Sequence, residues 1–370
     1  MNYCNTCVQP DTRPGIKFDA QGVCPACRYA ESLPHVDWDA RIAELKAVVQ
    51  RTNKDNHSGY DCVIGVSGGK DSTRQALWVR DVLGLKPLLV SCTYPPEQLS
   101  ERGAYNLGNL ISLGFDTVSV GPNPQVWKKL LRRSFLEYGN WAKSTETALY
   151  ATLPRVAIAH HIPLAFLGEN PATQMGDLAT GSLNWDANKM KNTNTISQGA
   201  DIYLGDGVEP KDLVAYRYPS DEEMEWGNIQ VAYLGYFWPN FTKVDNAAFS
   251  ISHGLQVRTD TPAERGALHP FEALDEDFVF VNQMIKYFKY GFGKVTDEVS
   301  ELIRFGRLGR EEALDLVKKY DGKCSPEYIR RFCEYIDITE EKFWEVAESY
   351  RNKDLFEKIG EEWKLKSTYV

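Results

Sequence analysis

Short apolar runs alternate with amphipathic segments over the first half of the chain. Runs rich in β-branched residues predict buried strands at 60–66, 87–92, 116–120 and 163–168. Apolar residues at helical spacing predict helices at about 40–51, 72–83, 104–113, 126–138 and 153–161. Strands that alternate with helices in this way predict an α/β fold with a doubly wound parallel sheet.

After about residue 205 the pattern becomes mainly helical. One more strand is expected at 231–238. The helices expected after it lie at about 281–290, 295–305, 310–319, 325–335 and 339–348. These patterns divide the chain into a cysteine-rich module at 1–35, an α/β domain at 36–205 and a mainly helical C-terminal extension at 206–370.

Four of the eight cysteines fall within the first 27 residues. They are Cys4, Cys7, Cys24 and Cys27. Each Cys-x-x-Cys pair sits on a tight turn, so its sulfurs can converge on one ion, and two such turns make the tetrahedral site of a zinc ribbon. A short strand at Ile16–Phe18 and a turn at Asp19–Gly22 would join the pairs. Zinc is expected here as a structural ion; four free thiols and an iron–sulfur cluster are the alternatives.

A glycine-rich turn follows the first predicted strand and opens a helix. Its residues are Ser67, Gly68, Gly69, Lys70, Asp71 and Ser72. Backbone N–H groups at the start of a helix are unpaired, and glycines allow close approach, so such a turn forms an anion nest. Lys70 adds positive charge, and Asp71 suits a Mg²⁺ ion that bridges phosphates. The turn matches neither the Walker A pattern nor the dinucleotide G-x-G-x-x-G pattern.

Other polar residues follow the predicted strands at the same edge of the sheet. Ser91 and Thr93 lie at the end of the second strand, and Glu169 follows the fourth. Ligands of doubly wound sheets bind beyond the carboxyl ends of the strands. These residues are therefore expected near the glycine-rich turn.

Bulk properties narrow the class of protein. The net charge of −9 and the lack of a basic stripe disfavour a nucleic-acid-binding protein. The sequence contains no run of about 18 apolar residues, so no membrane span is predicted. The first residues, Met1–Cys4, lack the features of a secretory signal. We therefore expect a cytoplasmic enzyme that binds neither nucleic acid nor membrane.

The hexapeptide S-G-G-K-D-S after a buried strand resembles the PP-loop of the ATP pyrophosphatase superfamily, whose fold is adenine nucleotide alpha hydrolase-like. The resemblance implies that ATP is cleaved between its α and β phosphates, which adenylates a second substrate and releases pyrophosphate.

Further strings resemble the N-acetyl sugar amidotransferases of lipopolysaccharide, O-antigen and other surface-polysaccharide biosynthesis, which are WbpG-like and PseA-like. They are the opening residues 3–16, Gly168–Pro171, Tyr233–Trp238 and Lys289–Gly293. The resemblance spans nearly the whole chain. It implies that the acetamido oxygen of a nucleotide-activated sugar is adenylated and that ammonia then displaces AMP, which leaves an acetamidino group.

The resemblance also implies roles for single residues. Lys70, Asp71, Glu169, Lys286 and Lys289 are the expected catalytic residues, with Glu169 holding Mg²⁺ or orienting ammonia. Lys286 and Lys289 lie three residues apart on one face of a predicted helix, where a solvated surface is the alternative. The expected nucleotide and substrate contacts are Ser67 to Ser72, Ser91, Thr93, Gly168 and Asn170. ATP, Mg²⁺ and structural Zn²⁺ are the expected cofactors, and residues 206–370 would complete the substrate site.

The source of ammonia is expected to be a separate partner. No cysteine sits in a glycine-rich nucleophile turn, and residue 1 is Met, so a glutaminase site is not predicted in this chain. The resemblance implies separate glutaminase and cyclase-like subunits. The sugar stays open between a UDP-linked diacetamido uronic acid and a CMP-linked nonulosonic acid. Two other functions stay open as well: a PP-loop tRNA-modifying enzyme and a non-catalytic nucleotide sensor.

Overall fold

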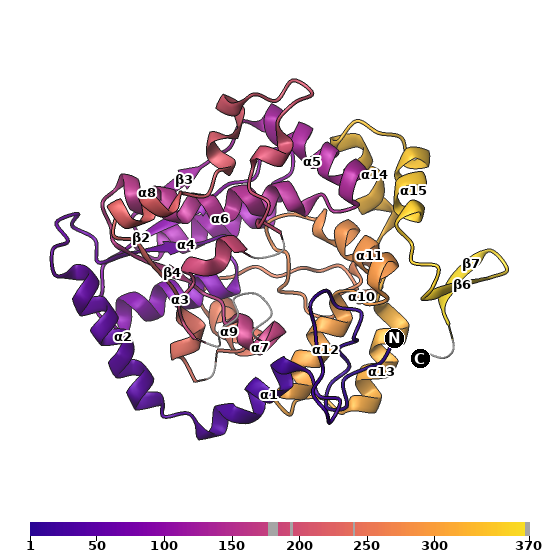
Figure 1. The fold of residues 1–370 in the computed structure, drawn as a ribbon, viewed down its shortest axis with the longest axis horizontal. Helices are drawn as coiled ribbons and strands as arrows, with labels where there is room; N and C mark the ends of the chain where they lie inside the picture. Colours follow the sequence, from indigo (N-terminus) through magenta and orange to yellow (C-terminus); the bar gives the residue numbers. More distant parts are fainter. Residues whose placement is uncertain (177–183, 193–194, 240, 367–370) are drawn as a thin grey trace.

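The computed structural model describes residues 1–176, 184–192, 195–239 and 241–366 (Figure 1). Its main sheet has five strands in the order β3-β2-β1-β4-β5, and every neighbouring pair is parallel. The strands are β1 (Cys62–Gly65), β2 (Pro87–Cys92), β3 (Thr117–Val120), β4 (Leu164–Leu167) and β5 (Gln230–Tyr233). The predicted parallel α/β fold is confirmed, and the sheet extends beyond residue 205 through β5.

Helices cover both faces of this sheet. Helix α2 (Trp38–Asn53) precedes β1, and the helices that connect the strands are α3 (Lys70–Asp81), α4 (Glu101–Ser112), α5 (Pro124–Tyr138), α6 (Ala142–Ala159), α7 (Pro171–Met175) and α8 (Asp221–Trp226). Ile64 points into a core shared with α2, α3 and α4, whereas its neighbour Val63 points into a core shared with α6. Alternate residues of a strand face opposite sides of a sheet, so a continuous apolar run serves both layers.

The strand order fixes where a ligand can bind. β1 lies between β2 and β4, and the chain crosses on different faces to reach these two neighbours. At such a switch point the loops after the two strands separate and leave a crevice at their carboxyl ends. The glycine-rich turn follows β1, and Gly168 and Glu169 follow β4. The fold thus brings together the two motifs that the sequence separates by about a hundred residues.

The start of one predicted helix was wrong. The pattern predicted a helix at 153–161, which would begin one residue before Pro154. Helix α6 instead begins at Ala142 and contains Pro154 in its interior. Its first half buries Ser144, Thr145 and Thr147 together with the small apolar residue Ala148. Thr147 satisfies its hydroxyl by donating to the carbonyl of Lys143 at 2.7 Å. Buried polar residues that bond to their own helix hide the apolar periodicity on which such predictions depend.

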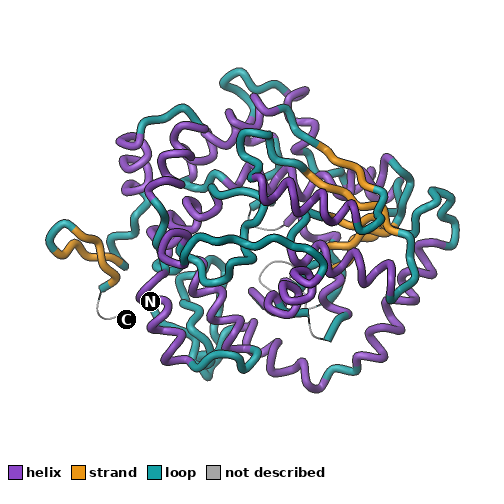
Figure 2. The backbone as a smooth tube through the Cα atoms, turned by 180° about the vertical axis from the view of Figure 1, so that it is seen from behind, coloured by secondary structure: helices purple, strands orange, loops and turns teal. Residues whose placement is uncertain are grey.

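The C-terminal part is mainly helical, as predicted, and ends in an unpredicted hairpin. Its elements are α9 (Lys243–Ser252), α10 (Pro262–Arg265), α11 (Val279–Tyr290), α12 (Lys294–Arg304), α13 (Arg310–Tyr320), α14 (Pro326–Tyr335), α15 (Glu340–Ser349), β6 (Phe356–Ile359) and β7 (Glu362–Leu365). Aromatic residues of α5, α11, α14 and α15 form a common core. Figure 2 shows the main sheet and the β6–β7 hairpin at opposite ends of the molecule.

The N-terminal module packs on the other two parts. Its helix α1 (Pro25–Ser32) lies against α7 and α12, and Val8 joins Val295 and Val299 in one apolar cluster. The strand predicted at Ile16–Phe18 is absent from the described residues, where only an isolated bridge joins Tyr3 and Pro10. The predicted turn is present, because the N–H of Gly22 donates to the carbonyl of Asp19 at 2.9 Å.

Among the helices described, none combines the length and the apolar character needed to cross a membrane.

Candidate functional site

The glycine-rich turn has the backbone of an anion-binding loop. Gly68 adopts a φ of +83°, and a Cβ atom there would lie 2.6 Å from the backbone nitrogen of Leu107, so only glycine fits. Gly69 caps α3, and the N–H of Ser67 donates to Ser72 Oγ at 3.0 Å. The Ser72 hydroxyl therefore braces the loop from within. The start of α3 directs unpaired N–H groups and the positive end of its dipole toward the loop.

The loop forms one wall of a cavity of about 100 Å³, the phosphate-loop cavity. Gly103 and Asn106 of α4 form a second wall, and residues of the segment 271–275 form a third. This segment comes from the C-terminal part, so the predicted loop faces a part of the chain that lies two hundred residues away. An anion held here would contact both.

Three lysines from separate segments gather around one carboxylate beside this loop. Glu272 lies 3.3 Å from Lys70 Nζ, 2.8 Å from Lys294 Nζ and 3.9 Å from Lys243 Nζ. Lys70 is 7% exposed, and its Nζ also lies 3.1 Å from Asp71. Burial by itself would lower the pKa of Lys70, but the charges of Asp71 and Glu272 raise it above its ordinary value. Lys70 therefore stays protonated at neutral pH, and Lys243 has a second carboxylate partner in Glu301 at 3.3 Å.

Asp321 fixes the position of Lys294. The N–H groups of Gly293 and Val295 donate to its carboxylate at 2.7 and 3.0 Å, and Thr296 Oγ1 donates at 2.7 Å. These bonds satisfy the start of α12, whose first residue is Lys294. Gly293 and Lys294 thus repeat the arrangement of Gly69 and Lys70, in which a glycine caps a helix and a lysine opens it.

The sequence patterns did not point to Lys243, Glu272 or Lys294. A signal existed for Lys294, because the motif Lys289–Gly293 ends one residue before it. We find no comparable local signal for Lys243, which sits in the first turn of the unpredicted helix α9, or for Glu272, which lies in a loop. Their role becomes visible only when the chain folds back on the sheet.

Asp71 faces α9 at the rim of the loop. It accepts a hydrogen bond from Asn246 Nδ2 at 2.6 Å, and Ser250 Oγ of the same helix donates to the carbonyl of Lys70 at 2.7 Å. About a third of the Asp71 side chain is exposed, so one face of the carboxylate is open to an ion. Its predicted role as a Mg²⁺ ligand stays a prediction.

Glu169 stands beyond the end of β4 and lines a second cavity of about 420 Å³. We call it the large cavity because it exceeds the phosphate-loop cavity; a cavity of about 950 Å³ lies elsewhere, beside β7. Glu169 is an exposed residue that faces this cavity. The loss of bulk water raises the pKa of Glu169 to about 7, and the negative charges of Asp71 and Glu146 add to the rise. A carboxyl group with this pKa can accept or release a proton near neutral pH.

Lys286 and Lys289 line the large cavity together with Glu169, not the phosphate-loop cavity. Lys286 Nζ lies 2.7 Å from Asp297, and Lys289 Nζ donates to the carbonyl of Tyr138 at 2.8 Å. Burial lowers the pKa of both lysines from the ordinary value. Contact of either lysine with the ATP phosphates stays a prediction.

A third cavity of about 150 Å³ lies beside both of the others. It shares Asp275 with the phosphate-loop cavity and Gln283 with the large cavity, and Glu272 and Lys294 also line it. The third cavity therefore adjoins both of the others, and Lys294 and Glu272 of the lysine cluster lie on its wall.

The other predicted contacts have structural partners. Ser91 is buried within β2, and Thr93 pairs through its N–H with the carbonyl of Val120 at 2.9 Å. Asn170 is buried and donates to Tyr29 Oη and to the carbonyl of Gly235, both at 3.3 Å. A Cβ atom on Gly168 would lie 2.7 Å from the side chain of Gln75. Ligand roles for these residues stay predictions.

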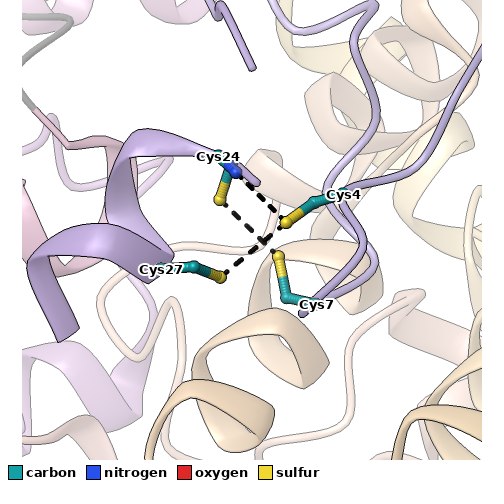
Figure 3. Close-up of side chains that lie close together, drawn as sticks. All are labelled: Cys4, Cys7, Cys24 and Cys27. Carbon is teal, nitrogen blue, oxygen red and sulfur yellow. Dashed lines mark hydrogen bonds between the residues drawn. The ribbon is translucent and has the colours of Figure 1, made fainter. Parts of the chain in front are cut away.

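The four N-terminal cysteines converge as predicted. Figure 3 shows their sulfur atoms pointing toward one another, all within 4.8 Å. The Sγ atoms of Cys4 and Cys27 lie 3.9 Å apart, and those of Cys7 and Cys24 lie 3.8 Å apart. A tetrahedral ion with metal–sulfur bonds of about 2.3 Å separates its ligands by about 3.8 Å, so the four thiolates fit a single metal ion. All four are buried and no fifth ligand position is open, as in structural sites.

Curated proteins and solved structures provide no informative relative of this chain. A comparison with curated proteins finds no match. Among solved structures, the U34-tRNA thiolase NcsA from Methanococcus maripaludis, with its 4Fe-4S cluster, is 14% identical over 86% of either chain at a TM-score of 0.35. A likeness this low carries no argument, so the fold class rests on the sheet topology above.

A family model gives the more informative match. Residues 272–369 match the model described as "LPS biosynthesis protein WbpG-like, C-terminal domain". The matched segment begins at Glu272 and includes Lys286, Lys289 and Lys294. Together with the phosphate-loop geometry it supports an enzyme that uses ATP. The C-terminal part of the chain is thus similar to the C-terminal domain of WbpG-like proteins, which supports the resemblance found in the sequence.

Proposed function

We propose that this chain is an ATP-dependent sugar amidotransferase, which converts the acetamido group of a nucleotide-activated N-acetyl sugar into an acetamidino group. One observation carries the proposal: the phosphate-loop cavity and the large cavity with Glu169 follow the adjacent strands β1 and β4. A nucleotide in the first and an amide in the second would meet beside the lysine cluster.

The loop and the lysines would hold the β and γ phosphates of ATP. Backbone N–H groups of the loop can donate hydrogen bonds to phosphate oxygens. Lys70, Lys243 and Lys294 would stabilise the negative charge that develops on the leaving pyrophosphate. Asp71 would hold Mg²⁺, which neutralises part of the phosphate charge. The α-phosphorus is then free for attack by the acetamido oxygen of the sugar, which forms a P–O bond while the bond to pyrophosphate breaks.

Glu169 would manage the proton of the second half-reaction. Ammonia attacks the carbon of the imidoyl adenylate, and the C–O bond to AMP breaks. The nitrogen must lose a proton to become the neutral amidine, which then takes up a proton from water. With a pKa of about 7, Glu169 can accept that proton when it is ionised. Its place at the end of β4, on the wall of the large cavity, suits this role.

The N-terminal site would hold Zn²⁺ with a structural role. Four buried thiolates with the spacing of a single tetrahedral ion support zinc over an iron–sulfur cluster, in which the four cysteines are shared among two or four irons. We also propose that ammonia comes from separate glutaminase and cyclase-like subunits, because no glutaminase motif is found in the sequence.

The decisive test is the product pattern. The purified chain, ATP, Mg²⁺ and ammonium chloride are incubated with a UDP-linked diacetamido uronic acid or a CMP-linked nonulosonic acid, and the sugar nucleotides are analysed by mass spectrometry. We expect replacement of one oxygen by NH, with AMP and pyrophosphate formed in equal amounts. Formation of ADP and phosphate, or AMP formation that depends on added tRNA and not on the sugar, would contradict the proposal.

A further inference from the structure

The segment between the two cysteine pairs reaches the large cavity. Arg13 and Pro14 belong to this segment and line the cavity beside Tyr290 and Phe292. In Figure 1 the N-terminal segment, drawn in indigo, lies against α12. The four-cysteine module is therefore next to the candidate substrate site, although the sequence places it at the far end of the chain.

Three contacts fasten this segment to the C-terminal part. Thr12 Oγ1 donates to the carbonyl of Tyr290 at 2.5 Å. The guanidinium group of Arg13 lies over the ring of Phe292, 4.9 Å from its centroid, and forms an ion pair with Asp297. Such stacked and paired arginines hold a fixed orientation. Arg13 is thus presented to the cavity in one geometry.

A short chain of hydrogen bonds links Arg13 to the metal site. The N–H of Gln9 donates to Cys7 Sγ at 3.4 Å, and Arg13 Nη2 donates to Gln9 Oε1 at 3.2 Å. Gln9 is 1% exposed and cannot move without disturbing its surroundings. The position of the Arg13 guanidinium therefore depends on the turn that Cys7 forms at the metal.

The charges on this side of the cavity do not balance. Arg13 and Lys286 share one carboxylate, that of Asp297. No carboxylate among the described residues lies within ion-pair distance of Lys289, which bonds to a backbone carbonyl. These three cations have one paired carboxylate among them, and the carboxyl groups of Glu146 and Glu169 line the same cavity. We call Arg13, Lys286 and Lys289 the cationic wall. Arginine and lysine in such a wall suit a phosphate or a carboxylate group.

We propose that the four-cysteine module is part of the substrate site: its metal ion fixes the turn that holds Arg13, and the cationic wall binds an anionic group of the sugar nucleotide. The inference rests on the proposed function, because it assumes that a sugar nucleotide occupies the large cavity. It adds Arg13 and the metal ion to the groups that determine substrate affinity.

The first test removes the guanidinium group. Arg13→Met keeps an unbranched apolar stem and removes the guanidinium group, and the full-length metal-loaded chain is titrated with UDP-N-acetylglucosamine and with its uronic acid by calorimetry. We expect the dissociation constant to rise about 10- to 100-fold, the range for one charge-assisted hydrogen-bonding group, with ATP binding unchanged. Arg28→Met is the matched control, because Arg28 lies in the same module but pairs with Asp19 and Glu31 at the surface.

The two ligands identify the anion that is bound. An equal loss for both assigns the cationic wall to the phosphates, and a loss confined to the uronic acid assigns it to the carboxylate. The inference is wrong if Arg13→Met binds both ligands as tightly as the unchanged chain. If the unchanged chain binds no sugar nucleotide at all, the proposed function fails first.

The second test breaks the link and keeps both ends. Gln9→Met retains Arg13 and the four cysteines but removes the acceptor for Arg13 Nη2. We expect UDP-sugar affinity to fall about tenfold, in the range of one hydrogen bond to a charged group, while a zinc assay still finds one ion per chain. Removal of the ion by a chelator should weaken sugar-nucleotide binding at least as much and leave ATP binding intact. Unchanged sugar-nucleotide affinity in both samples would refute the link.

Discussion

The phosphate-loop cavity and the large cavity lie at the same edge of one sheet but are built in different ways. Six consecutive residues supply the whole loop wall of the first. The second is assembled from segments that include the cysteine module, α6, the end of β4 and α11. A contiguous motif fixes its geometry through local backbone conformation, whereas an assembled cavity depends on tertiary packing. The comparison suggests that chemistry common to a superfamily belongs to the first and substrate choice to the second.

The strongest test of this difference between the two cavities is Glu169→Gln, which should impair amidation and leave ATP binding by the loop unchanged. We expect kcat to fall about 10²- to 10⁴-fold, the usual contribution of a general base, while ATP binding is unchanged. In the unchanged chain kcat/KM should rise with pH to a plateau, with a midpoint near the Glu169 pKa of about 7. The variant should lose this limb of the profile, which is measured by AMP release between pH 5 and 9. An unaltered profile would exclude Glu169 as the base.

The same variant has a signature in stability. The pKa of Glu169 is raised from 4.5 to about 7 in the fold, so between these values the folded state binds more protons than the unfolded state. The contribution of Glu169 to the free energy of unfolding is therefore greatest below pH 4.5 and is lost as pH rises through 7. Urea titrations should show a smaller decline over this window for Glu169→Gln than for the unchanged chain.

Lys294→Met should impair the nucleotide chemistry from the C-terminal part, since Lys294 lines the third cavity beside the phosphate-loop cavity. Loss of one group that stabilises the leaving pyrophosphate should lower kcat about 10²- to 10³-fold, a range typical of one transition-state contact. Lys289→Met, assayed at saturating sugar nucleotide, is the control for nucleotide chemistry, because Lys289 lines the large cavity and neither of the other two. Positional isotope exchange of labelled ATP measures adenylation without ammonia. If both variants lowered that exchange equally, the two cavities could not be assigned separately to nucleotide chemistry and to substrate binding.

Gly68→Ala should weaken the loop and the fold together. The positive φ alone costs about 1 to 3 kcal/mol of unfolding free energy for a residue other than glycine, and the new methyl group would press on the backbone of Leu107. Gly84→Ala is the control, since Gly84 has a φ of +69° and nothing within 4 Å. Urea denaturation should show a loss for both, larger for Gly68, and only Gly68→Ala should lose ATP affinity.

The smallest expected effect is that of Glu146→Gln. Its negative charge is one of the causes that raise the pKa of Glu169, so its removal should shift the midpoint of the kcat/KM profile to lower pH, with little change in the plateau. Glu137→Gln, an exposed residue of α5, should leave the midpoint unchanged. An unchanged midpoint for Glu146→Gln would show that the charge of Glu146 does not influence the pKa of Glu169.

The sheet and the loop could be predicted because their signals are local. Strand β2 was placed at Pro87–Cys92 as observed, and the turn after β1 lies where its glycines indicate. The four cysteines could be predicted for the same reason, since each pair occupies one turn. Locally encoded backbone geometry survives folding unchanged.

Features that depend on long-range packing could not be predicted. Helix α9 and the residues Lys243 and Glu272 carry no local pattern of function, and they matter only because the chain returns to the loop. The start of α6 was missed because its buried face is rich in hydroxyl groups. Arg13 lies within the opening motif at residues 3–16, where nothing local indicates a binding role. Its contact with the large cavity follows from the docking of the module on α12.

The carboxylate of Glu272 has a consequence for how the nucleotide is received. It gathers Lys70, Lys243 and Lys294 during folding, so these flexible side chains are already ordered before a ligand arrives. Ordering a free lysine costs up to about 2 kcal/mol in conformational entropy. Because Glu272 imposes that order in advance, more of the attraction between lysines and phosphate is left to appear as affinity.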